Sequence, residues 1–128
     1  MVAKKRFWIF CISLVLGAVF WRAIFYLRNG EVALLREITG LSFHHYTYGI
    51  LIVFIAALFL IFYKVDKYSI ALMGFGLGSI FDGFVSRLFS SSARSVEITN
   101  YNAVVIPTIL LFLILISLSA CFYLVNRK

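Results

Sequence analysis

Charge, proline and cysteine are all scarce in this 128-residue sequence. Charged residues make up 13% of the chain and apolar residues 63%, whereas a soluble domain has about 25% and roughly 45–50%. This composition excludes both an ordinary soluble domain and a disordered chain. The single proline, Pro107, lies in the first turn of an apolar stretch, where it favours a helix start. Only Cys11 and Cys121 are present, and we expect both to be reduced in the cytosol.

Long apolar stretches are what the sequence does contain. Each has about the 20 residues that a helix needs to cross a ~30 Å hydrocarbon layer. None alternates with a period of two, which excludes the strands of a membrane barrel. The sequence therefore predicts an all-α, four-transmembrane-helix bundle that forms a single membrane domain over residues 1–128. The predicted helices are Phe7–Leu27, Phe43–Tyr63, Tyr68–Phe89 and Ala103–Val125.

The basic residues predict an orientation for this bundle. With a cytoplasmic N-terminus, seven basic residues and one acidic residue, Asp66, lie on the cytoplasmic side, against five basic and four acidic residues on the other. This asymmetry is the positive-inside signal, and it places both termini in the cytoplasm. Basic residues at helix ends indicate contact with anionic lipid headgroups, and nucleic-acid binding is not expected. The seven are Lys4, Lys5, Arg6, Lys64, Lys67, Arg127 and Lys128.

A stripe of small and polar residues runs along one face of the third predicted helix. Gly74, Gly78, Asp82 and Ser86 follow one another at steps of four, so they share that face. Glycines at this spacing let helix backbones approach closely in lipid. We expect Gly74 and Gly78 to serve helix packing, either within the bundle or across a homodimer.

Ionisable residues inside predicted membrane spans are functional candidates, because an unpaired charge in hydrocarbon is costly. Arg22 and Asp82 both lie roughly 21–23 Å from the cytoplasmic ends of their helices at 1.5 Å per residue. Arg87 lies closer to the outer surface, and His44 and His45 begin the second span from the same side. These residues are therefore predicted to meet in the outer third of the bilayer.

Simpler interpretations exist for several members of this set. Arg22 and Asp82 neutralise each other if they pair, which joins two helices. Arg87 reaches the outer headgroups if its side chain extends to the interface. His44 and His45 lie among aromatic residues that are common in interfacial belts.

A metal site is one function that these residues predict. Two imidazoles and a carboxylate, from His44, His45 and Asp82, suit Zn, Fe or Cu with a coordination position left for water or substrate. Adjacent helical residues point about 100° apart, so both histidines reach one ion only if the helix starts irregularly.

An anion site is the other leading prediction. Arg22 and Arg87 suit the phosphate or carboxylate of a lipid-like ligand, with a histidine as general acid or base. Tyr48 shares a helix face with His44 and adds a polar group there. We expect membrane lipid as a partner. The sequence also leaves open a homo-oligomer, a non-enzymatic accessory or assembly subunit of a larger membrane complex, and a small transporter.

Two motifs carry a family resemblance. His44-His45-Tyr46-x-x-Gly49 opens one span, and Gly76-x-Gly78-x-x-x-Asp82 lies in the next. In these motifs the chain resembles a loose group of small prokaryotic integral membrane proteins with no assigned activity. The resemblance implies a prokaryotic cytoplasmic membrane and a joint role for the histidines, Tyr48, Gly49 and Asp82.

Overall fold

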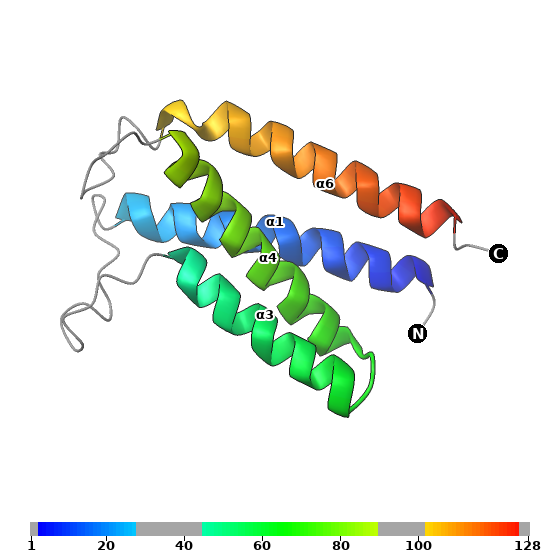
Figure 1. Cartoon of the computed structure of the whole chain (residues 1–128). Coiled ribbons are helices and arrows are strands. Elements are labelled where there is room, and N and C mark those ends of the chain that lie inside the picture. Colours follow the sequence, from blue (N-terminus) through cyan, green and yellow to red (C-terminus); the bar gives the residue numbers. More distant parts are fainter. Residues whose placement is uncertain (1–2, 28–44, 90–101, 126–128) are drawn as a thin grey trace, which may run out of the picture.

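The computed structural model describes residues 3–27, 45–89 and 102–125, and these ranges form helices and no strand (Figure 1). The prediction of an all-α fold with four helices is confirmed. The helices are α1 (Ala3–Leu27), α3 (His45–Phe62), α4 (Lys67–Phe89) and α6 (Val105–Val125).

Consecutive helices run in opposite directions (Figure 1). The start of α1, the end of α6 and the connection between α3 and α4 lie at one end of the bundle, which we call the termini end. The end of α1, the start of α3, the end of α4 and the start of α6 lie at the other, which we call the distal end.

Three of these helices, α1, α4 and α6, are long and apolar enough to cross a membrane. The remaining helix, α3, is also apolar but is shorter than the other three. Its 18 residues span about 27 Å at 1.5 Å per residue. It was predicted as Phe43–Tyr63. The observed helix begins at His45 and ends at Phe62, while Phe43 and His44 lie outside the described residues.

Helix α4 packs closely against α1 through glycines on both helices. A Cβ atom added at Gly78 would lie 2.0 Å from the backbone oxygen of Leu14, and one at Gly74 would lie 2.6 Å from that of Phe10. On α1, a Cβ at Gly17 would lie 2.2 Å from the backbone oxygen of Phe75. Gly74 and Gly78 thus lie against α1 of the same chain.

Another face of α4 packs equally closely against α3. A Cβ atom added at Gly49 would lie 2.7 Å from the backbone oxygen of Gly76. Half of the most apolar stretch of α4 is buried, against 11% of that of α6. Helix α4 is therefore the central helix of the bundle and α6 a peripheral one.

Helix α6 contacts the bundle at a few points. Phe112 is buried with Leu14 of α1, and Thr108 is buried one turn before Phe112. At the termini end the Tyr123 ring stacks on Phe7, with 5.2 Å between ring centroids. Most other α6 side chains are exposed and apolar.

The start of α4 is fixed by reciprocal hydrogen bonds in a capping arrangement. The Ser69 N–H donates to Asp66 Oδ1 at 2.8 Å, and the Asp66 N–H donates to Ser69 Oγ at 3.2 Å. The first of these bonds, with the Ser69 hydroxyl, lowers the pKa of the Asp66 carboxyl below its ordinary value. The carboxylate of Asp66 thus acts as a hydrogen-bond acceptor that caps the start of α4.

We predict that Gly78→Ala destabilises the bundle by about 1–3 kcal/mol, because the added methyl group collides with the Leu14 backbone. Without the collision, the substitution would stabilise a helix by about 1 kcal/mol, so the sign of the effect is informative. Denaturant unfolding in detergent, followed by circular dichroism, measures the change.

Val19→Ile is the matched control, since it adds one methyl group to a side chain that is 53% exposed on α1. We expect it to change the unfolding free energy by less than about 0.5 kcal/mol. Equal stability of Gly78→Ala and the wild type would contradict the close α1–α4 packing.

Candidate functional site

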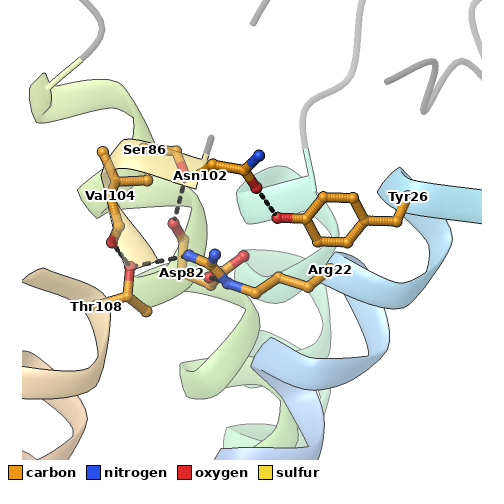
Figure 2. A network of polar contacts seen from close by, with 7 residues as sticks. All are labelled: Arg22, Tyr26, Asp82, Ser86, Asn102, Val104 and Thr108. Atoms are coloured by element: carbon orange, nitrogen blue, oxygen red, sulfur yellow. Dashed lines mark hydrogen bonds and ion pairs between the residues drawn. The ribbon is translucent and has the colours of Figure 1, made fainter. Parts of the chain in front are cut away.

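An ion pair between α1 and α4 forms the centre of the site (Figure 2). Arg22 Nε donates to Asp82 Oδ1 at 2.7 Å. The side chain of Asp82 has no exposed surface, and that of Arg22 is 16% exposed. A carboxylate buried this completely is tolerated only with a partner that satisfies its charge, and the guanidinium is that partner.

A third helix joins the pair through a hydroxyl group. Arg22 Nη2 donates to Thr108 Oγ1 at 2.9 Å, and the Thr108 hydroxyl donates to the Val104 backbone oxygen at 2.7 Å. The bond to Val104 orients the Thr108 oxygen so that it accepts from the guanidinium. Figure 2 shows these contacts joining α1, α4 and α6. We call Arg22, Asp82 and Thr108 the distal network.

The position of Asp82 follows from the small-residue stripe on α4. Gly74 and Gly78 lie against α1, and Asp82 is the next residue at the same spacing, so it also faces α1. One turn later the Ser86 hydroxyl donates to the Asp82 backbone oxygen at 3.0 Å. The glycines thus bring the helices close, and Asp82 meets Arg22 at the end of the same interface.

Trp21 connects this level of the bundle to the start of α3. Its Nε1 donates to Ser79 Oγ at 2.8 Å, and the Ser79 hydroxyl donates to the Phe75 backbone oxygen at 2.8 Å. The Trp21 ring stacks on Tyr48, with centroids 5.3 Å apart and planes 16° apart. Because Tyr48 lies in the first turn of α3, the start of that helix lies beside the residue that precedes Arg22.

A further hydrogen bond lies one turn along α1 from the distal network. The Tyr26 hydroxyl donates to Asn102 Oδ1, and both residues are exposed (Figure 2). This bond joins the end of α1 to the residues just before α6. The α1–α6 contact at the distal end is therefore largely polar.

The residues predicted from sequence have different outcomes. Arg22 and Asp82 are in direct contact, Tyr48 stacks on Trp21, and Arg87 is exposed on α4. His44 lies outside the described residues, and His45 is described only as the first residue of α3. Within the described ranges, no group of three His, Cys, Asp or Glu residues is close enough to hold a metal ion. The proposed His44, His45 and Asp82 ligand set thus extends beyond the described part of the chain.

Sequence reasoning missed two polar contacts of α6. Thr108, which lies in the predicted helix Ala103–Val125, is a buried acceptor for Arg22. Asn102, just before that predicted helix, accepts a hydrogen bond from Tyr26. Their position along the chain was the signal that could have found them. Both residues lie near the start of α6, which is at the same end of the bundle as Arg22 and Asp82.

Comparisons of the chain with protein-family models, curated proteins and solved structures found no match.

We predict that Arg22→Met and Asp82→Leu each destabilise the protein by about 3–5 kcal/mol, because each leaves a buried charge without its partner. The double variant Arg22→Met/Asp82→Leu loses much less than the sum of the two, since no charge is left behind. Denaturant unfolding of the wild type, the two single variants and the double variant, followed by circular dichroism, gives the four unfolding free energies of this double-mutant cycle.

The control is Arg6→Met, which removes an exposed arginine from the same helix as Arg22. Its expected effect is below about 0.5 kcal/mol. Additive losses in the double variant would show that the two charges do not interact.

Proposed function

We propose that this chain is an integral membrane protein that binds an anionic, lipid-like ligand at its distal end. Both termini face the cytoplasm in this proposal, so the site opens toward the outer leaflet. The observation that carries the proposal is the fixed position of Arg22, which is held by acceptors on two other helices.

Preorganisation is the reason why this arrangement favours binding. A guanidinium that is already oriented loses little conformational entropy when a phosphate or carboxylate arrives. Its planar N–H donors match both kinds of anion. The 16% exposure of the Arg22 side chain leaves part of it accessible.

Net charge also favours an anion over a cation here. Two arginines, Arg22 and Arg87, and one acidic residue, Asp82, are described toward the distal end. The described ionisable groups near the distal network therefore have a positive balance. Tyr26 and Asn102 lie one turn farther out and add neutral polar groups for the ligand's headgroup.

Thermal unfolding of the protein in a neutral detergent tests this proposal with dihexanoyl phosphatidic acid as the anionic probe. At ten times its Kd, a ligand that binds only the folded state contributes about 1.4 kcal/mol, which raises the Tm by roughly 5 °C. Dihexanoyl phosphatidylcholine, whose headgroup is neutral overall, is expected to raise it much less. The Arg87→Gln variant should fold normally and show a reduced response to the anionic lipid.

Arg87→Lys is the matched control, because it keeps the positive charge at this position of α4. It should keep the full response. Equal shifts with both lipids, or an undiminished response in Arg87→Gln, would refute the anion site.

A metal site built on His44, His45 and Asp82 is the second candidate. The contact between Trp21 and Tyr48 favours it, because it places the first turn of α3 beside the Arg22–Asp82 level. The bond between Asp82 and Arg22 weighs against it, since a guanidinium competes with a metal for the carboxylate. In the same assay on untagged protein, this candidate predicts a Tm increase with Zn²⁺ that disappears in the His44→Ala/His45→Ala variant.

A further inference from the structure

The termini end carries a second charged feature that the distal site does not use. Five exposed basic residues come from two segments, the first turn of α1 and the α3–α4 connection together with the first residue of α4. Both segments lie at the same end of the bundle (Figure 1). The residues, which we call the basic rim, are Lys4, Lys5, Arg6, Lys64 and Lys67.

The five basic residues of the rim outnumber the acidic ones in the same described segments, although the positive charge of Lys64 acts on Asp66. The acidic residue among the rim residues is Asp66, and its carboxylate accepts the Ser69 N–H at the start of α4. The rim therefore presents a net positive charge outward. The distal end differs, because one of its arginines, Arg22, is paired with Asp82 and only partly exposed.

Aromatic side chains border the rim on the apolar side. Trp8 is 54% exposed, and Tyr63 and Tyr68 are exposed on either side of the α3–α4 connection. The Lys67 ammonium lies 4.8 Å from the centre of the Tyr68 ring. Exposed Trp and Tyr next to Lys are typical of the headgroup level of a membrane. There the apolar ring contacts lipid chains, and the charged ammonium group contacts water and headgroups.

We propose that the basic rim binds the headgroups of anionic phospholipids. The rim's positive charge, the adjoining aromatic side chains and the apolar outer surface of the helices all fit a lipid surface with negative headgroups. The inference rests on the membrane location proposed above but not on the distal site. Such binding enriches anionic lipid around the termini end. It also holds the termini end in the leaflet that contains more anionic lipid.

The two tryptophans of the chain allow a direct test, because Trp8 lies beside the rim and is exposed, whereas Trp21 is 9% exposed. The protein is reconstituted in phosphatidylcholine vesicles that contain either brominated phosphatidylglycerol or brominated phosphatidylcholine at the same mole fraction. Bromine quenches a tryptophan that it contacts. We expect the anionic lipid to have about a five-fold higher apparent affinity, which 0.5 M salt reduces.

The variant Lys4→Gln/Lys5→Gln/Arg6→Gln should bring this ratio close to one, while Lys4→Arg/Lys5→Arg, which keeps the charge of the rim, should leave it unchanged. Trp8→Phe should remove the selective signal. Equal quenching by the two lipids in the wild type, or a ratio retained in the triple variant, would overturn the inference. Absence of quenching by either lipid would instead refute the membrane location itself, and with it both proposals.

Discussion

The contact between Arg22 and Asp82 constrains the arrangement of three of the described helices, α1, α4 and α6. An aspartate with no exposed surface in an apolar bundle is stable only beside a positive group, so α1 and α4 must present these residues at the same level. The second guanidinium nitrogen then determines where α6 begins to pack, because Thr108 is its acceptor. A peripheral helix with few buried residues is thereby attached through a polar contact.

Close packing and charge pairing depend on each other along the α1–α4 interface. Leu14 backbone atoms lie where a side chain at Gly78 would be, and Asp82 follows one turn later. Larger residues at the glycine positions would separate the helices and move the carboxylate away from the guanidinium. The same helix uses Gly76 on another face to approach α3, so α4 forms close interfaces on two sides. Trp21 and Ser79 add a hydrogen bond between α1 and α4 near the charged level.

Much of this arrangement could be predicted from the sequence, because hydropathy and residue counting report on helix length and depth. The predicted ends at Leu27, Phe89 and Val125 agree with the structure. Helix α1 begins earlier than predicted, at Ala3, because backbone hydrogen bonding continues beyond the apolar segment. The pairing of Arg22 with Asp82 was one of two open interpretations, since depth alone does not determine which way a side chain faces. Thr108 was missed because a single threonine in an apolar helix ordinarily donates to the backbone oxygen one turn earlier, as Thr108 does to Val104, which gives no signal of a second partner.

The separation of the charged pair along the chain has a consequence for biosynthesis. Arg22 and Asp82 are sixty positions apart, so α1 is complete well before its counter-charge has been translated. In the membrane location that we propose, the nascent first helix would hold its guanidinium near the headgroups until α4 arrives. Docking of α4 would then draw the arginine inward, and α6, which follows α4 in the chain, would add its threonine to an ion pair that already exists.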